Sequence, residues 1–237
     1  MTAPARAMVL AAGLGLRMRP ITETVPKPLV AVGGRTMLDR ALDHLVRAGV
    51  GDAVVNVHYL PGMIVRHLET RSAPRIAISR EEALLETGGG VAKALPLLGA
   101  APFYVVNADI VWLDGARPAL LRLADTWDAA RMDALLLLHP RDGAIGYDGA
   151  GDFRLAGDGR ALRRDGATAP FVFTGVQILH PALFDGAPGG AFSLNVLYDR
   201  AAARGRLCGL AHDGGWLHIG TPAGLAEAEA ALAARGR

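Results

Sequence analysis

Cysteine is nearly absent from this sequence of 237 residues, and both net charge and long apolar runs are scarce. Cys208 is the only cysteine, which excludes an intrachain disulfide and a metal site built from several cysteines. The formal charge is +2 and the arginines are scattered, so the composition does not favour nucleic-acid binding. No apolar run approaches the roughly 18 residues of a membrane span, and the N-terminus lacks the pattern of a signal peptide. We therefore expect a cytoplasmic enzyme that works without a membrane or a nucleic acid.

What the sequence does contain is an alternation of strand-like and helix-like segments over its first 140 residues. Strands are expected at 7–11, 53–57, 75–79, 103–107 and 132–138, with helices between them. The 103–107 segment is almost wholly apolar, as expected of a central strand covered on both faces. This pattern predicts an α/β fold, a three-layer α/β/α sandwich of Rossmann-like type around a mostly parallel sheet.

After about residue 140 the pattern changes to short strands, expected at 153–156, 161–164 and 171–179. Gly157-Asp158-Gly159 is typical of a hairpin turn. A helix at 194–203 and a strand at 207–211 should follow, and then a last helix with Thr221 as N-cap and Pro222 in its first turn. Because no repeat or long linker interrupts the chain, we expect residues 1–237 to form one domain with two halves, about 1–140 and 141–237.

A glycine-rich segment, LAAGLGLRMRP, runs from Leu10 to Pro20 after the first expected strand. Gly13 and Gly15 allow positive φ and a close approach of the backbone to a ligand. Freed N–H groups in such a loop form an anion-binding concavity, and Arg17 adds a guanidinium that can hold two phosphate oxygens. Lys27 follows between two prolines. Together these features predict a site for a polyphosphate.

Two common phosphate loops do not fit this segment. A Walker A loop, G-x-x-x-x-G-K-[ST], is absent, and a dinucleotide fingerprint requires a third glycine where this sequence has Met18. The acidic residue expected about 20 residues further on is also missing, since Asp39 lies in a helical pattern. A dehydrogenase that binds NAD or FAD is therefore an alternative that the sequence disfavours.

Two further motifs carry candidate chemistry. Glu86-Thr87-Gly88-Gly89-Gly90 places three glycines before a helical stretch, which predicts either a flexible loop or a backbone lying against a flat ligand. Asn107-Ala108-Asp109 ends the fourth expected strand, and ligands of open α/β sheets bind beyond the carboxyl ends of strands. An aspartate there can also be a simple turn cap.

The spacing of these motifs resembles that of the sugar-1-phosphate nucleotidyltransferases, whose opening signature reads L-A-A-G-x-G-x-R-[ML]-x-P followed by P-K-[PA]-[LM]. The matching residues are Leu10, Ala11, Ala12, Gly13, Gly15, Arg17, Met18 and Pro20, then Pro26, Lys27, Pro28 and Leu29. The resemblance extends over almost the whole chain and implies the reaction of a nucleoside triphosphate with a sugar 1-phosphate.

The resemblance also implies roles for individual residues. Arg17, Lys27 and Asp109 would be catalytic, with Asp109 holding Mg²⁺. The nucleotide would contact Leu10, Ala11, Ala12, Gly13, Gly15, Glu86, Thr87, Gly88 and Asn107. The segment Gly215–Pro222 is similar to the family's W-x-D-[IV]-G-T-P motif, but His218 stands where many members have a second metal-binding aspartate. Imidazole suits Mn²⁺ better than Mg²⁺. Three roles for His218 therefore stay open: it binds the metal, it forms a hydrogen bond to a phosphate, or it is a residue of the active-site wall.

In the second half, the resemblance implies a sugar site at Asp152, Thr174, Gly175 and Asn195. The L-x-T-G-G-G variant is similar to the branch of the family that joins UTP to N-acetylmuramic acid 1-phosphate in cell-wall recycling, and these are the expected substrates. A guanylyl- or thymidylyltransferase acting on a mannose, heptose or glucose 1-phosphate is an alternative. A regulator that binds a nucleotide sugar without turnover is another, supported only by His218.

Overall fold

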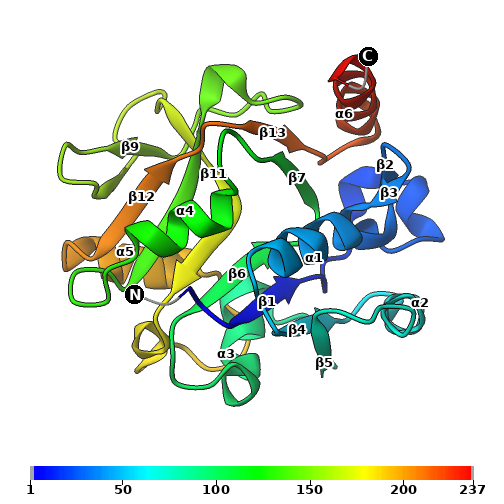
Figure 1. Cartoon of the computed structure of the whole chain (residues 1–237), viewed down its shortest axis with the longest axis horizontal. Coiled ribbons are helices and arrows are strands. Elements are labelled where there is room, and N and C mark those ends of the chain that lie inside the picture. The colour runs from blue at the N-terminus through cyan, green and yellow to red at the C-terminus, as the bar shows by residue number, and fades with distance from the viewer. Residues whose placement is uncertain (1–2, 236–237) are drawn as a thin grey trace.

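A computed structural model describes residues 3–235, and nine of the strands in this range form one mixed sheet (Figure 1). The strands are β1 (Arg6–Leu10), β4 (Asp52–Val57), β5 (Arg75–Arg80), β6 (Phe103–Asn107), β8 (Ala134–Pro140), β9 (Phe153–Leu155), β10 (Ala161–Arg163), β11 (Phe171–Leu179) and β12 (Leu207–Ala211). The run β6-β1-β4-β5 is parallel, and β12 is parallel to β8. The long strand β11 lies antiparallel between β6 and β8 and so joins the two halves of the chain in one sheet.

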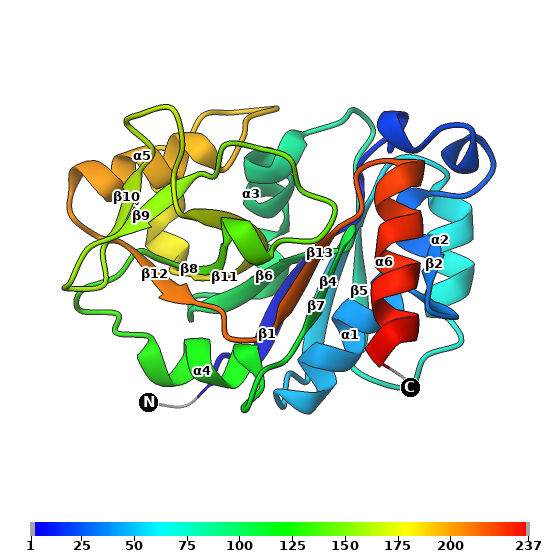
Figure 2. The same cartoon turned by 90° about the horizontal axis from the view of Figure 1, so that it is seen from above.

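The sheet is covered by helices on both faces (Figure 2). On one face lie α1 (Met37–Arg47), α2 (Pro61–Leu68) and α4 (Ala119–Thr126), which share an apolar core with alternate residues of the strands. On the other lie α3 (Glu86–Leu98) and α5 (Asn195–Ala203), which pack on a second core. These three layers are the α/β/α sandwich that the sequence predicts.

Helix α1 illustrates how the sequence produces this packing. Its buried residues Leu38, Ala41, Leu42 and Leu45 recur every three or four positions and are all 0 % exposed. Burying one leucine stabilises the fold by about 1.5–3 kcal/mol, so this single face accounts for a sizeable share of the local stability. The Thr36 hydroxyl accepts a hydrogen bond from the Asp39 N–H at 3.0 Å and fixes the start of the helix.

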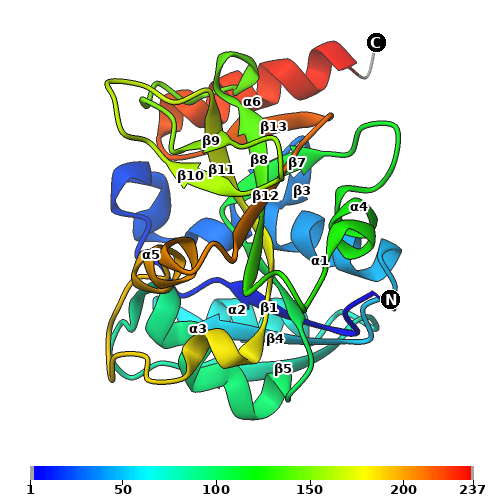
Figure 3. The same ribbon diagram turned by 90° about the vertical axis from the view of Figure 1, so that its left-hand side faces the viewer.

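A small antiparallel pair, β7 (Ile110–Leu113) with β13 (Gly215–His218), lies apart from the main sheet, and neither strand was expected from the sequence. Helix α6 (Pro222–Arg235) runs beside β13 (Figure 3) and packs on a third apolar cluster that includes Val32 of the short strand β2 (Ala31–Val32). Strand β2 pairs with β3 (Arg35–Thr36). The β7–β13 pair is important because it joins the residues after Asp109 to the segment that carries His218.

Most of the expected elements are confirmed to within two residues, including the hairpin turn at 157–159, where the Gly159 N–H donates to the Ala156 carbonyl. The prediction of a flexible loop at 86–90 is wrong, because these residues form the first turns of α3. Among the described residues, no helix combines the length and the apolar character needed to cross a membrane.

Candidate active site

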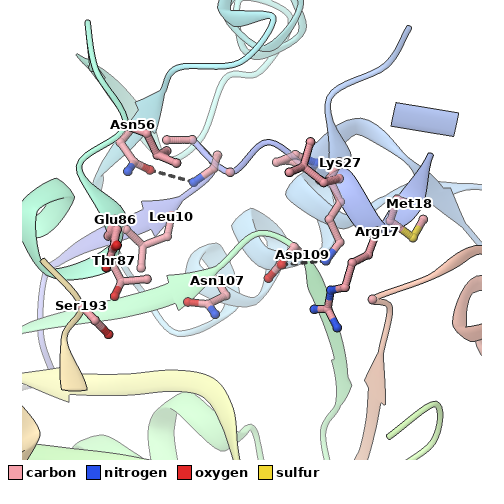
Figure 4. A pocket seen from close by; sticks show the side chains of 18 residues that line it. Leu10, Arg17, Met18, Lys27, Asn56, Glu86, Thr87, Asn107, Asp109 and Ser193 are labelled. Atoms are coloured by element: carbon pink, nitrogen blue, oxygen red, sulfur yellow. Dashed lines mark hydrogen bonds and ion pairs between the residues drawn. The ribbon is translucent and has the colours of Figure 1, made fainter. Parts of the chain in front are cut away.

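A cavity of about 580 Å³ opens at the carboxyl ends of β1, β4 and β6 (Figure 4). Eleven of the residues predicted from the sequence line it: Leu10, Ala11, Ala12, Gly13, Gly15, Arg17, Lys27, Glu86, Thr87, Asn107 and Asp109. Figure 4 shows Arg17, Lys27 and Asp109 together at one end, and Asn56, Glu86 and Thr87 at the other. The cavity therefore has a charged end and an end without a cationic side chain.

The charged end is built on the glycine loop after β1. Gly15 has φ +66°, and its carbonyl accepts hydrogen bonds from the Thr22 hydroxyl at 2.8 Å and the Met18 N–H at 2.9 Å. The Met18 bond closes a single 3₁₀ turn at Leu16–Met18, and a bond from the Glu23 N–H to the Pro20 carbonyl closes a second one at Ile21–Glu23. A dinucleotide fingerprint opens an α-helix at this point, so the local geometry argues against the dehydrogenase alternative.

Lys27 and Asp109 form an ion pair at the centre of this end. Lys27 Nζ donates to Asp109 Oδ2 at 2.8 Å, with the lysine side chain 9 % exposed and the aspartate 40 % exposed. Lys27 begins a 3₁₀ turn between Pro26 and Pro28, which limits the backbone around it. The Asp109 carboxylate is thus bonded to Lys27 through Oδ2, while the rest of the group faces the cavity.

His218 reaches the same region through the small strand pair. The antiparallel register places His218 opposite Ile110, the residue after Asp109. Burial, together with the positive charges of Lys27 and Arg17, lowers the pKa of His218, so its imidazole is neutral at neutral pH. A Cβ placed on Gly220, which lines the cavity, would lie 2.6 Å from His218 Nε2. The ring therefore stands just behind the cavity wall.

These side chains fit a divalent ion only with help from a substrate. The described residues contain no group of three or more His, Cys, Asp and Glu that could hold a metal by themselves. Mg²⁺ is commonly bound by one or two carboxylates, with substrate phosphates and water completing its octahedral shell. Asp109, with His218 close by, supplies such a partial set of ligands.

The opposite end of the cavity is formed by the start of α3. The three glycines here pack against protein: a Cβ on Gly88 would lie 2.3 Å from the Phe192 ring, and one on Gly89 would lie 2.3 Å from the Gly190 carbonyl oxygen. The Gly88 N–H donates to the Phe192 carbonyl at 2.8 Å. Gly88 is buried and does not line the cavity, whereas Glu86 and Thr87 do.

Two buried polar residues that the sequence analysis missed connect this end to the glycine loop. Asn56, at the end of β4, accepts a hydrogen bond from the Ala11 N–H through Oδ1 and donates one to Glu81 through Nδ2, both at 2.7 Å. Glu81 in turn accepts from the Leu85 N–H at 3.0 Å. The signal was available, because Asn56 is a polar residue at the carboxyl end of an apolar strand in a predicted parallel sheet.

None of the four predicted sugar residues lines the cavity. Gly175 has φ +85°, and a Cβ there would lie 2.9 Å from the Asn107 amide. Thr174 is fully buried and its hydroxyl donates to the Leu137 carbonyl at 2.8 Å. Asp152 accepts from the Phe173 N–H, and Asn195 accepts from Arg163. Their present contacts hold β11 and α5 in place behind the cavity.

Comparison with known proteins gives a consistent result. Residues 6–147 match the model of the family described as nucleotidyl transferase. The chain is 47% identical over 237 residues to an N-acetylmuramate alpha-1-phosphate uridylyltransferase of Caulobacter vibrioides, covering 98% of each chain. It is 37% identical to a protein of the same name from Neisseria meningitidis, covering 95% of this chain and 97% of the relative. A crystal structure of UDP-glucose pyrophosphorylase with UDP-glucose superposes with a TM-score of 0.80 at 17% identity, covering 97% of this chain and 98% of that one, which supports the fold.

Proposed function

This chain belongs to the nucleotidyl transferase family, and on that premise we propose that it transfers a uridylyl group from UTP to N-acetylmuramic acid 1-phosphate, releasing pyrophosphate. The observation that carries the proposal is the cavity itself, in which Arg17, Lys27 and Asp109 meet at one end of a space lined by both signature segments. The choice of substrates is supported by the two relatives of near-equal length, which carry the name of this activity.

The proposed reaction needs no nucleophile from the protein. An oxygen of the sugar phosphate attacks the α-phosphorus of UTP, and the bond to pyrophosphate breaks on the opposite side, so that UDP-N-acetylmuramic acid forms. Because two anions must meet, catalysis depends on positioning and on neutralising charge. Arg17 and the backbone N–H groups of the Gly13–Gly15 loop would hold the β- and γ-phosphates, and Lys27 would hold a phosphate at the reacting centre.

Enzymes of this family generally use a divalent metal ion. In this chain Asp109 would hold Mg²⁺, or Mn²⁺, with His218 as a further candidate ligand, and the ion would supply positive charge that offsets the repulsion between the two phosphate-bearing substrates. Asp109 fits this role because 40 % of its side chain is exposed at the charged end of the cavity.

The remaining predicted residues would form the two ends of the substrate site. Leu10, Ala11, Ala12, Glu86, Thr87 and Asn107 would surround the nucleoside, and Gly88 would act from behind the cavity by positioning Thr87. The hydrogen bonds of Asn56 and Glu81 would fix the distance between β1 and α3. Asp152, Thr174, Gly175 and Asn195 would shape the sugar site from the second half of the chain, mainly by holding β11 and α5. The reaction uses a nucleoside triphosphate, and we propose that it takes place in the cytoplasm, in peptidoglycan recycling.

The test is pyrophosphate release with UTP, dTTP, GTP, ATP and CTP, each paired with N-acetylmuramic acid, N-acetylglucosamine, glucose and mannose 1-phosphates. We expect UTP with N-acetylmuramic acid 1-phosphate to give the highest kcat/KM, because a pocket that bonds one base edge rejects bases that leave its polar groups unpaired. A preference for GTP would replace this proposal with a guanylyltransferase, and tight binding without any pyrophosphate release would favour a non-catalytic regulator.

A further inference from the structure

The ammonium group of Lys27 is bonded to one carboxylate oxygen of Asp109, the residue proposed to hold the metal ion. Its Nζ lies 2.8 Å from Asp109 Oδ2, and this is an ion pair between a 9 % exposed lysine and a carboxylate that faces the cavity. Lys27 is thus the cation that balances the charge of Asp109 in this arrangement. The same two residues are those that the proposed function assigns to a phosphate and to a metal ion.

The choice of lysine here is unusual for this chain. Lys27 and Lys93 are the only lysines in a sequence that otherwise uses arginine for positive charge. Lys93 is exposed and donates to the Arg80 carbonyl. The ammonium of lysine is a compact point charge that can pass from one oxygen to another, whereas the planar fork of arginine is suited to staying with a single carboxylate. A residue that must change partners is therefore better served by lysine.

Burial makes the pair obligatory in the free protein. The Lys27 stem is held between Pro26 and Pro28 and packs beside Gly15, where an added Cβ would lie 3.2 Å from Lys27 Cβ. A buried ammonium without a counter-ion carries a large desolvation cost, so Lys27 cannot leave Asp109 unless another anion replaces it. The phosphates of a nucleotide entering the cavity supply that anion.

We propose that Lys27 keeps Asp109 closed to divalent ions until a nucleotide is bound, and that loading then exchanges both partners, Lys27 moving to a phosphate and Asp109 to the metal. This inference depends on the proposed function only in placing a nucleoside triphosphate in the cavity. It follows that metal binding and nucleotide binding strengthen each other. A bound nucleotide draws Lys27 away from Asp109 and so favours the metal, and a bound metal draws Asp109 away from Lys27 and so favours the nucleotide. The free enzyme binds the metal weakly, and substrate-free Asp109 stays electrically neutralised.

The first experiment measures Mn²⁺ binding to the protein without nucleotide, by the loss of the free Mn²⁺ signal in electron paramagnetic resonance. Lys27→Met should bind Mn²⁺ at least about tenfold more tightly than the wild type, since removing an internal competitor of this kind changes affinity by about 5–150-fold. Lys93→Met is the matched control, because it removes the same charge away from the cavity, and it should bind Mn²⁺ as the wild type does. Equal Mn²⁺ affinities in wild type and Lys27→Met would overturn the proposal.

The second experiment observes the exchange directly. With only two lysines, ¹⁵N-lysine labelling gives a spectrum in which the buried Lys27 ammonium should appear as a slowly exchanging signal that Asp109→Asn shifts. Adding uridine 5′-(α,β-methylene)triphosphate without metal should move this signal and leave that of Lys93 in place. If the Lys27 signal stays in its ligand-free position while the analogue is bound, Lys27 does not change partner and the proposal fails. Because neither experiment measures turnover, failure of the proposed reaction in the substrate panel would be a separate result.

Discussion

The two glycine-rich segments, residues 13–15 and 88–90, look alike in the sequence but serve different physical needs in the structure. Gly13 has no atom within 4 Å of an added Cβ, and Gly15 requires its positive φ. Gly88 and Gly89 have helical backbone, and an added Cβ on either would lie 2.3 Å from a neighbouring residue. The first segment is glycine-rich because Gly15 must adopt positive φ while Gly13 faces open space. The second is glycine-rich because a helix must lie close to another part of the protein.

This difference has a consequence for function. Beside the first segment the cavity contains the charged groups that can act on phosphates, namely Arg17, Lys27 and Asp109. At the second, the packing of Gly88 against the Phe192 segment fixes where the neighbouring Glu86 and Thr87 stand. Changes near the first segment should therefore alter rates, and changes within the second should alter stability first.

The largest effect is expected for Asp109→Asn, at the charged end. Loss of the charge that would balance the metal should lower kcat/KM by at least about 100-fold, which corresponds to a loss of about 2.7 kcal/mol of transition-state stabilisation. The asparagine oxygen can still accept the hydrogen bond from Lys27, so the melting temperature should fall by no more than about 10 °C. Steady-state kinetics with Mg²⁺ and a thermal melt check this, and an unchanged rate and metal dependence would contradict the metal role of Asp109.

Arg17→Ala should have the next largest effect. A charge-assisted contact to phosphate contributes about 1.5–3 kcal/mol, so kcat/KM should fall at least about tenfold while the melting temperature stays nearly constant. Arg19→Ala, at an exposed neighbouring position, is the matched control and should behave as the wild type. If Arg17→Ala kept wild-type rates below saturation, the phosphate role of the loop would have to be abandoned.

Gly89→Ala and Gly13→Ala test the comparison itself. Alanine favours helix over glycine by up to about 1 kcal/mol, but at Gly89 its Cβ would lie 2.3 Å from the Gly190 carbonyl oxygen. Overpacking costs about 1–3 kcal/mol, so we expect the clash to dominate and the melting temperature to fall by about 2–10 °C. Gly13→Ala should leave melting unchanged and lower only the rate. The reverse pattern in melts and kinetics would show that the two segments have been assigned the wrong roles.

The smallest effect is expected at His218. Its pKa is lowered by burial and by Lys27 and Arg17, so the neutral imidazole is present above a folded-state pKa that lies below about 6.5. If neutral His218 binds the metal, activity is full above that pKa and is lost as the pH falls through it. His218→Asp should remove this acid limb and shift preference a few-fold from Mn²⁺ toward Mg²⁺. Profiles of kcat/KM against pH with each metal check this, and identical profiles would leave His218 a wall residue.

Much of the site could be predicted because it depends on local patterns. The glycine loop directly follows the strand that ends at Leu10, and Asn107 and Asp109 end or follow a second strand that its own apolar run identifies. The rule that ligands bind at the carboxyl ends of parallel strands brings these two distant segments to one edge of the sheet. Glu81 could not be predicted in the same way, because its importance comes from a hydrogen bond to Asn56, 25 positions away. The loop predicted at residues 86–90 is wrong because glycine content indicates a flexible backbone equally well in a loop and in a tightly packed helix. Which of the two applies depends on the neighbouring residues in the fold, here Phe192 and Gly190.

The sequence by itself determined the α/β layers, the positions of nearly all helices and strands of the main sheet, and the segment that bends beside the cavity. These follow from apolar periodicity and from turn chemistry, which act over a few residues. Only the tertiary structure decided that β13 pairs with β7 and so brings His218 beside Asp109, and that Lys27 holds Asp109 across 82 positions of chain. Such pairings depend on burial and charge balance in the folded protein, where a desolvated ammonium must find an anion wherever the fold provides one.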